Sequence, residues 1–308
     1  MEVLRGGDIV VMKVVFNRWK HIQAYSWPFR VFKQYYEELN GMYWANYASG
    51  KYIYKSMASN GYTWDSKPNE VLDLPEDKYN FSTLRNWSNL YNSSFVWQRL
   101  NLLMSLSSIL ETYMSAICSL AIESNPGVLI NSSKSVDGVR YLKQKKTVRP
   151  LGDDHIVAIT KGEWNKRIAV FQKLFGNLPD ASIKDLPVLE SLRKVRNQIG
   201  HSYGRDISKS RSFEIKDKLP LNGVSDENLL KYFSVVYKFA VCVDKLLMDN
   251  HIGEYQTILL YHNFYFQMHP VGVPSERANS FRKYHGKNYY PYVTKSFCLD
   301  LVNYYHSL

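Results

Sequence analysis

The stretch LRKVRNQIGHSYGRD, residues 192–206, contains residue types that can do chemistry. Arg196 and His201 have four residues between them, and Asn197 directly follows the arginine. A histidine titrates near neutral pH and can therefore move a proton as a base or as an acid. An arginine carries a permanent charge on a planar fork that matches a phosphate or another oxyanion. These residue types therefore suit proton transfer beside a negatively charged group.

The spacing of the pair restricts how it can work. Each residue of an ideal helix turns by about 100°, so Arg196 and His201, five positions apart, point about 140° away from each other. They can cooperate by one of two routes. Either the helix ends or distorts near Gly200 and Gly204, or a second copy of the chain supplies the matching side chains. The alternative is structural, because arginine and histidine near a helix C-terminus offset the dipole, and the spacing alone favours that interpretation.

Helices must position these residues, and the apolar periodicity predicts a mainly α fold. The strongest pattern begins near residue 92, repeats every three or four residues, and stops at Asn125-Pro126-Gly127. Further amphipathic helices are predicted over residues 162–175, 185–200 and 225–247. The inner face of the last helix is predicted to consist of Leu229, Phe233, Val236, Ala240, Val243 and Leu247. Four amphipathic helices with one long connection are enough for a helical bundle.

The segments on either side of this bundle are rich in aromatic residues. A helix is predicted from Trp27 to Asn40-Gly41, followed by a short strand or irregular segment in which Tyr52 and Tyr54 alternate. Residues 124–160 are predicted to form loops or short strands. The predicted organisation is an aromatic-rich N-terminal segment, a helical bundle, and an aromatic and basic C-terminal segment, with the ranges 1–91, 92–250 and 251–308.

Within a helical bundle, the string R-N-x-x-x-H at a helix end resembles the signature of the HEPN superfamily. Many of these small helical domains are metal-independent ribonucleases of bacterial toxin–antitoxin and phage-defence systems. Arg196, Asn197 and His201 match the signature, and the resemblance covers roughly residues 92–250. It implies a HEPN-like bundle that forms a homodimer, with the Arg and His of both copies in one cleft. It also implies that the 2′-OH of RNA attacks, leaving a 2′,3′-cyclic phosphate.

The resemblance extends to Tyr203, two residues after the histidine. One branch of HEPN toxins carries R-x4-H-x-Y, and its antitoxin nucleotidyltransferase modifies that tyrosine. Tyr203 is therefore predicted to be a regulatory residue, and such a nucleotidyltransferase or another defence-system protein is a predicted partner.

Other residues are assigned to the same site. Glu111 is the only carboxylate in the apolar stretch 102–122. If it is buried it needs a partner, for which the cations of the string are candidates, and the alternative is a charge on the bundle surface. Asn197 is predicted to orient His201 through an i,i+4 hydrogen bond. The predicted catalytic residues are therefore Arg196, His201, Asn197 and Glu111.

Basic residues of the string and of the C-terminal segment are predicted to bind RNA, and these are Arg193, Lys194, Arg205, Arg282 and Lys283. The C-terminal stretch SFRKYHGKNYYPY, residues 280–292, interleaves basic and aromatic residues. Single-stranded RNA is held by stacking on aromatic faces and by basic contacts to phosphate, so this stretch is a candidate RNA contact. The alternative is that its tyrosines pack a terminal subdomain against the bundle.

Composition indicates the surroundings in which the chain works. The net charge is +11, and residues 131–217 contain 18 Lys or Arg against 10 Asp or Glu. Such a balance predicts attraction to a polyanion, either nucleic acid or an anionic membrane. Cys118, Cys242 and Cys298 are far apart and odd in number, which favours free thiols in a reducing compartment. With no signal-peptide pattern at the N-terminus, we expect a cytoplasmic protein.

The stretch 102–122 is long enough to span a bilayer, but its charge and hydroxyl residues favour a buried helix in a soluble bundle, with no membrane partner. A stripe of small residues on this stretch would let another helix approach closely, which favours a homodimer, and it consists of Ser108, Thr112, Ser115 and Ser119. The spacing of His, Cys, Asp and Glu matches no metal motif, and no phosphate-binding glycine loop is present, so no metal or cofactor is expected.

Two classes of function follow. The first is a metal-independent endoribonuclease, acting as a toxin or phage-defence effector with RNA as its substrate. The alternative is a non-catalytic HEPN-like module that binds RNA or a nucleotide, or that serves in assembly.

Overall fold

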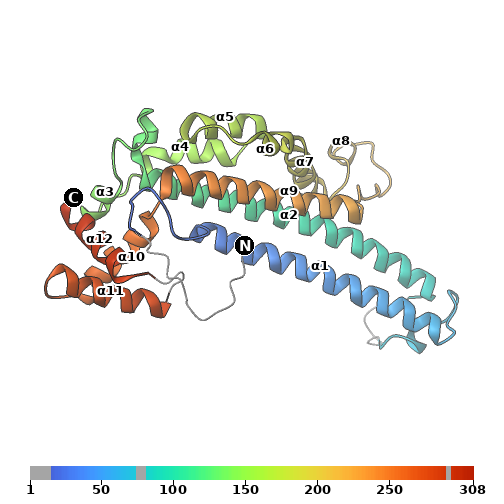
Figure 1. Ribbon diagram of the computed structural model, residues 1–308. Coiled ribbons are helices and arrows are strands. Elements are labelled where there is room, and N and C mark those ends of the chain that lie inside the picture. Colours follow the sequence, from blue (N-terminus) through green and yellow to red (C-terminus); the bar gives the residue numbers. More distant parts are fainter. Residues whose placement is uncertain (1–14, 74–80, 289–292) are drawn as a thin grey trace.

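The computed structural model describes residues 15–73, 81–288 and 293–308. The predicted mainly α fold is confirmed, because the described residues contain no strand, only an isolated bridge between Asn17 and Lys20. Three long helices run side by side through the molecule (Figure 1), namely α1 (Trp27–Ser59), α2 (Leu84–Ser124) and α9 (Asp226–Leu247).

A second group of helices covers one side of α2 and α9. Its longer members are α4 (Arg149–Thr160), α5 (Trp164–Phe175) and α7 (Leu186–Ser202). The short helices α3 (Val139–Lys143), α6 (Asp180–Lys184) and α8 (Ile207–Ser210) lie in the connections. Helices α4 and α7 pack directly on α2, and α5 packs on both of them, so α7 is held between α2, α5 and α9.

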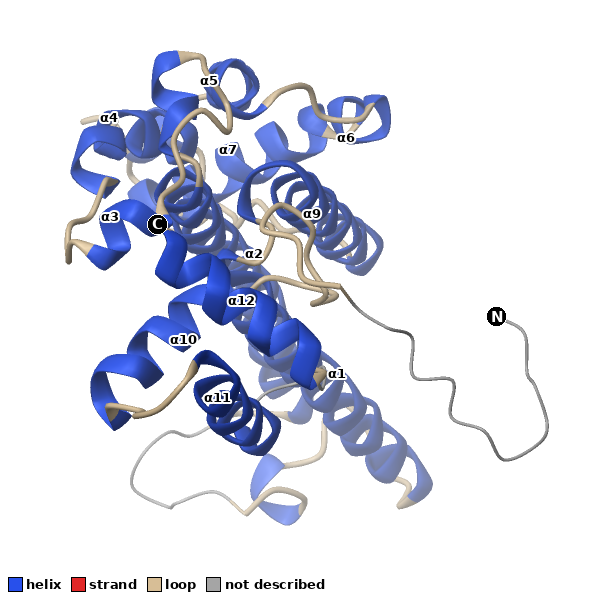
Figure 2. Ribbon diagram, turned by 60° about the vertical axis from the view of Figure 1, so that its left-hand side comes forward, coloured by secondary structure: helices blue, strands red, loops and turns tan. Residues whose placement is uncertain are grey.

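The C-terminal helices form a group of their own at one end of the bundle (Figures 1 and 2). A π-helical turn (Met248–Ile252) continues α9, and it is followed by α10 (Tyr255–Met268), α11 (Pro274–Asn288) and α12 (Lys295–Ser307). Short 3-10 turns at Pro68–Glu70 and Pro126–Ile130 complete the described elements.

The first helix is much longer than predicted. α1 continues through Gly41 to Ser59, so both the expected end at residues 40–41 and the expected strand beyond it are wrong. A glycine inside a helix costs only about 1 kcal/mol relative to alanine, and tertiary packing offsets that cost. The buried face continues past the glycine with helical spacing, at Tyr43, Gly50 and Met57.

The segment 124–160 is also helical where loops or strands were expected. α4 begins with Pro150 in its first turn, and it buries Gly152, Ile156 and Ile159. A Cβ at Gly152 would lie 2.8 Å from Ile122 of α2, so the two helices approach closely there. Because the two backbones approach closely, α4 packs on α2 with only a few buried apolar side chains.

Other predictions of the secondary structure are confirmed. α5, α7 and α9 lie within two residues of their predicted ranges, and all six residues of the predicted inner face of α9 are buried. The predicted boundary at residue 91 falls inside α2, however, and the boundary at 250 falls inside the π-helical turn. Phe29 and Phe32 of α1 also belong to the same core as α2 and α9, so α1 is part of the bundle.

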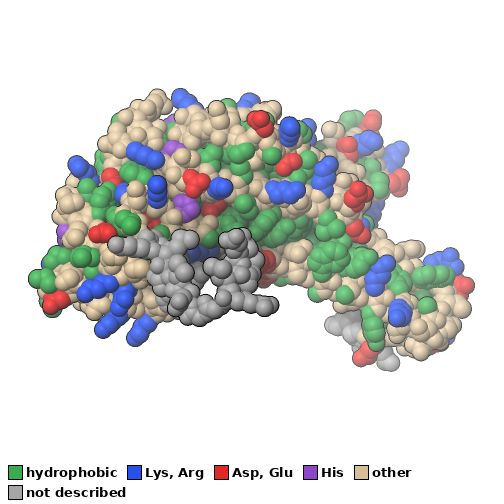
Figure 3. Space-filling view, viewed as in Figure 1, with side chains coloured by type: hydrophobic (Ala, Val, Ile, Leu, Met, Phe, Trp, Pro, Cys, Tyr) green, Lys and Arg blue, Asp and Glu red, His purple; other side chains and the backbone are tan. Residues whose placement is uncertain are grey.

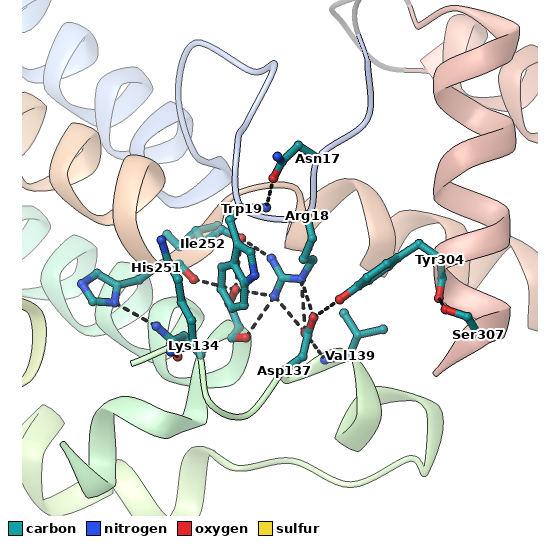
Figure 4. Close-up of polar contacts among 12 residues, drawn as sticks. Asn17, Arg18, Trp19, Lys134, Asp137, Val139, His251, Ile252, Tyr304 and Ser307 are labelled. Carbon is teal, nitrogen blue, oxygen red and sulfur yellow. Dashed lines mark hydrogen bonds and ion pairs between the residues drawn. The ribbon is translucent and has the colours of Figure 1, made fainter. Parts of the chain in front are cut away.

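A buried arginine connects the N-terminal strap, residues 15–26, to this bundle (Figure 4). Arg18 donates to the carboxylate of Asp137, to the carbonyl of Ile252 at 2.8 Å and to Ser124 Oγ at 2.9 Å. The hydroxyl of Tyr304 donates to the same carboxylate from α12. The guanidinium of Arg18 therefore joins the strap to Ser124, Asp137 and Ile252, and Asp137 extends the network to Tyr304.

Three further features of the fold are an apolar helix, a group of exposed hydrophobic side chains and three cysteines. By length and composition α2 could cross a membrane, and about half of its most apolar window is buried within the protein. Hydrophobic side chains gather on the face of the molecule that Figure 3 shows. Val31, Tyr35 and Met42 of α1 are among the exposed large hydrophobic residues. Cys118 and Cys298 are buried and Cys242 is half-buried, and all three are free thiols.

Candidate functional site

The predicted string lies on α7, and the helix continues past it. α7 ends at Ser202, and the left-handed backbone of the capping residue Tyr203 (φ 61°) allows its N–H to donate to the carbonyl of Gln198. Gly204 follows with φ 69°, and its N–H donates to the same carbonyl. The helix therefore ends near Gly204, as predicted, but it stays regular from Arg196 to His201, so its end does not turn the His201 side chain toward Arg196.

Arg196 points toward α2, where it meets Glu111. Its Nη2 lies 3.9 Å from Glu111 Oε2, and its Nη1 lies 3.4 Å from Asn197 Oδ1. Both distances are long for a charged contact, and 42% of the Arg196 side chain is exposed. The guanidinium of Arg196 therefore has a fixed position but keeps N–H donors that no close protein acceptor occupies. These donors can bind an anion from solvent.

A second arginine, Arg167 of α5, neutralises Glu111 more closely. Its Nη2 donates to Glu111 Oε1 at 3.0 Å, and its Nε donates to the carbonyl of Gly162 at 2.8 Å. Burial lowers the pKa of Arg167, and the Glu111 carboxylate opposes that effect. Glu111 therefore bridges a buried arginine and a half-exposed one. In the sequence, Arg167 is a cation among the apolar residues of its helix, and nothing there connects it with Glu111.

His201 lies in the last turn of α7 and is exposed. Among the described residues, its imidazole has no hydrogen bond or ion pair. The predicted hydrogen bond between Asn197 and His201 is not formed, so this prediction is wrong, and the Asn197 amide oxygen accepts from Arg196. Both ring nitrogens of His201 are open to a substrate or to a second copy of the chain.

Tyr203 stacks on Trp97 of α2. The ring centroids are 5.0 Å apart and the ring planes differ by 13°, yet Tyr203 remains 69% exposed. Gly204 makes the approach possible, since a Cβ there would lie 2.7 Å from Leu100 and 3.3 Å from the Trp97 ring. Nothing in the local sequence pattern indicates Trp97, because the pair depends on how the end of α7 docks on α2.

An open groove of about 600 Å³ lies between α2 and α4 beside Glu111. One wall carries small residues of α2 and the other carries two cations, and the lining consists of Glu111, Thr112, Ser115, Ala116, Ser119, Arg149, Thr160 and Lys161. The predicted small-residue stripe is therefore at least partly exposed, next to the string. This face can accept a ligand or a second copy, and the homodimer stays a prediction.

The predicted RNA-binding cations near the string differ in their freedom. Arg193 donates to Glu190 from Nε at 3.0 Å and from Nη2 at 2.6 Å. This pairing raises the pKa of Arg193 and lowers the pKa of Glu190. Arg205 donates to two backbone carbonyls, whereas Lys194 is exposed. Lys194 is thus the cation of these three that is most accessible to phosphate.

The predicted RNA-binding residues of the C-terminal segment lie elsewhere. Arg282 and Lys283 are exposed on α11, which lies at one end of the bundle and away from α7 (Figure 1). Phe281 is fully buried against aromatic rings of α10, which agrees with packing rather than RNA stacking at that position. Tyr289 and Tyr290 lie outside the described residues.

In the part of the chain that the structure describes, no group of three or more His, Cys, Asp or Glu side chains is placed to hold a metal ion. Comparisons with protein-family models, with curated proteins and with solved structures found no match. The functional argument therefore depends on the chemistry of the side chains described above.

Proposed function

We propose that the chain is a HEPN-type endoribonuclease that cleaves RNA without a metal ion, as a toxin or phage-defence effector. The observation that carries the proposal is an arginine with free N–H donors on the same helix as an exposed histidine. Arg196 lies 3.9 Å from Glu111, which lines an open groove with Arg149 and Lys161 on its far wall, and His201 is exposed in the last turn of the same helix.

The mechanism follows from the residue types. His201 takes the proton of the ribose 2′-OH, and the 2′-oxygen forms a bond to the adjacent phosphorus. The bond from phosphorus to the 5′-oxygen breaks, and that oxygen takes a proton from an acid, leaving a 2′,3′-cyclic phosphate and a 5′-hydroxyl. Arg196 stabilises the negative charge that builds on the phosphate oxygens. RNA supplies the nucleophile, so no metal-bound water is required.

A homodimer is part of the proposal. Because α7 is regular, Arg196 and His201 of one chain diverge. A twofold arrangement across the open face of α2 would place the histidine of one copy near the arginine of the other. Tyr203, exposed beside the string, would be accessible to a modifying nucleotidyltransferase, and an added nucleotide would place its phosphate against these cations.

The test is cleavage of total RNA by the purified protein in excess EDTA. We expect cutting to persist and the 3′ ends to resist ligation until the cyclic phosphate is removed. His201→Ala should lower the rate by about 10²- to 10⁴-fold. Arg196→Lys should recover little of the loss in Arg196→Ala, because a point charge does not reproduce the bidentate fork.

Two controls sharpen this test. Mixing the inactive His201→Ala and Arg196→Ala chains should restore some cleavage if two copies share one cleft. Lys231→Ala, on the exposed face of α9, should cut as the wild type does. If both string variants cut at the wild-type rate, the structural interpretation of the helix end is correct and the proposal fails.

One observation favours the alternative, a non-catalytic module that binds RNA or a nucleotide. The His201 imidazole has no partner among the described residues that would fix its tautomer and orientation. A binding module would shift the mobility of RNA in EDTA without cutting it, and both string variants would weaken that shift.

A further inference from the structure

We propose that the Trp97–Tyr203 pair is a nucleobase subsite, which seats one unpaired base of an RNA strand beside the string. The inference deepens the proposed function and rests on it for the identity of the ligand. Tyr203 offers an exposed aromatic surface on a ring that Trp97 already supports, with nearly parallel planes and centroids 5.0 Å apart.

The backbone of Tyr203 adopts an energetically unfavourable conformation. Its backbone is left-handed, a conformation that bulky residues rarely adopt, and such positions concentrate at functional sites. Neighbouring contacts hold it there: Asn222 N–H donates to the carbonyl of Gly204 at 2.8 Å, and Arg205 donates to the carbonyl of Tyr203 at 2.9 Å. The ring is therefore presented by a fixed loop.

The location suits the neighbour of a scissile phosphate. Tyr203 follows His201 by two residues, so the two positions are separated by less than one helical turn along the chain. The guanidinium carbon of Arg205 lies over the Tyr203 ring, 5.8 Å from the ring centroid, so a cation adjoins the exposed aromatic surface. An aromatic face with an adjacent arginine is the chemistry that holds single-stranded RNA with little sequence preference.

The ligand class follows from the geometry. A base within a duplex is already stacked on its neighbours, whereas an unpaired base has a free face. The subsite therefore predicts a preference for single-stranded RNA. The competing interpretation is that the Tyr203 ring only packs the end of α7 against α2, and it predicts a change in stability without a change in RNA binding.

The experiment measures RNA binding in the His201→Ala background, where the strand stays intact. The probes are a mixed-sequence RNA decamer, the same decamer with single abasic sites, and its duplex. Tyr203→Ala should weaken decamer binding by roughly 5- to 150-fold, and Tyr203→Phe should stay within about twofold. Tyr52→Ala, an exposed tyrosine on α1, is the matched control and should bind as the parent does.

Trp97 gives a readout that needs no change at Tyr203. Decamer binding should quench tryptophan fluorescence, and Trp97→Phe should remove most of that quenching while circular dichroism stays unchanged. Equal binding of Tyr203→Ala and its parent, or equal binding of intact and abasic decamers at every position, would overturn the subsite.

Cleavage by the otherwise wild-type chain separates this inference from the proposed function. If that chain does not cut RNA but binding depends on the Tyr203 ring, catalysis is wrong and the subsite stands. If it cuts RNA and Tyr203→Ala leaves KM unchanged, the subsite is wrong and catalysis stands. The supporting result is a raised KM with kcat nearly unchanged.

Discussion

Arg18 and Arg196 each face a carboxylate, but the protein surrounds them in opposite ways. Arg18 is 4% exposed, and its guanidinium donates to Asp137, Ser124 and the backbone of Ile252 (Figure 4). Arg196 is 42% exposed, and its two contacts are 3.4 and 3.9 Å long. The first group has its donors occupied by the protein, whereas the second has donors to spare.

The difference teaches how to separate a structural arginine from a functional one. A buried charge is tolerated only where paired and hydrogen-bonded, so Arg18 is explained by the fold alone. The fold does not account for Arg196 in this way. Arg167 lies between these extremes, because it is buried like Arg18 but shares its carboxylate with Arg196.

The largest expected effect is on Arg18. Arg18→Ala would leave Asp137, 11% exposed, without its cation, and breaking a buried pair costs about 3–5 kcal/mol of the free energy of unfolding. Arg196→Ala should change that free energy by no more than about 0.5 kcal/mol. Urea denaturation followed by circular dichroism measures both. Equal losses in the two variants would abolish the distinction between them.

A smaller effect is expected at Arg167. Arg167→Met removes the closer partner of Glu111, and loss of a hydrogen bond to a charged group costs about 1.5–3 kcal/mol. Removing the charge of Glu111 as well, in Arg167→Met with Glu111→Gln, should recover part of that loss. A double-mutant cycle measures the coupling between the two residues, and purely additive effects would show that the pair contributes nothing.

The sequence predicts those parts of the fold in which a helix buries a regular apolar stripe. The inner face of α9 is such a stripe, and every predicted member of it is buried. The second half of α1 is not predicted. Gly41 is typical of a helix end, and the alternating Tyr52 and Tyr54 are typical of a strand. Their helical state depends on packing against α2, which lies far along the chain.

The sequence likewise predicts only some of the residues of the candidate site. Arg196 and His201 are recognisable from residue type and spacing, and Glu111 is recognisable as a lone charge in an apolar stretch. Trp97 and Arg167 are not, because each joins the site from another helix through tertiary packing. The hydrogen bond expected between Asn197 and His201 is not formed, and the amide oxygen of Asn197 faces Arg196 instead.

The smallest expected effect extends the comparison to two histidines, buried His251 and exposed His201. His251 Nε2 lies 3.0 Å from the carbonyl of Phe175, and its Nδ1 lies 3.1 Å from the Asn125 amide nitrogen. The neutral ring fits these partners, donating from Nε2 and accepting at Nδ1. Burial lowers the pKa of His251, so the unfolded chain binds the proton more readily than the folded protein does.

The sign of the pH effect follows from this difference. The contribution of His251 to stability is present above the pKa of the unfolded histidine, near 6.5, and is lost as the pH falls below it, by at most about 1.4 kcal/mol per pH unit. Burial also lowers the pKa of His262, His285 and His306, with the same sign, whereas it raises the pKa of Asp244 and Glu254, with the opposite sign. The informative quantity is therefore a difference between variants.

His251→Gln keeps a donor for Phe175 and removes the titrating group. Urea denaturation between pH 7.5 and pH 5 should show a shallower loss of stability than in the wild type, by up to the slope of one proton, about 1.4 kcal/mol per pH unit. His201→Gln is the matched control, because it makes the same exchange of side chains at an exposed position. If the two variants change the pH dependence equally, the buried hydrogen bonds of His251 do not distinguish it from the exposed histidine of the string.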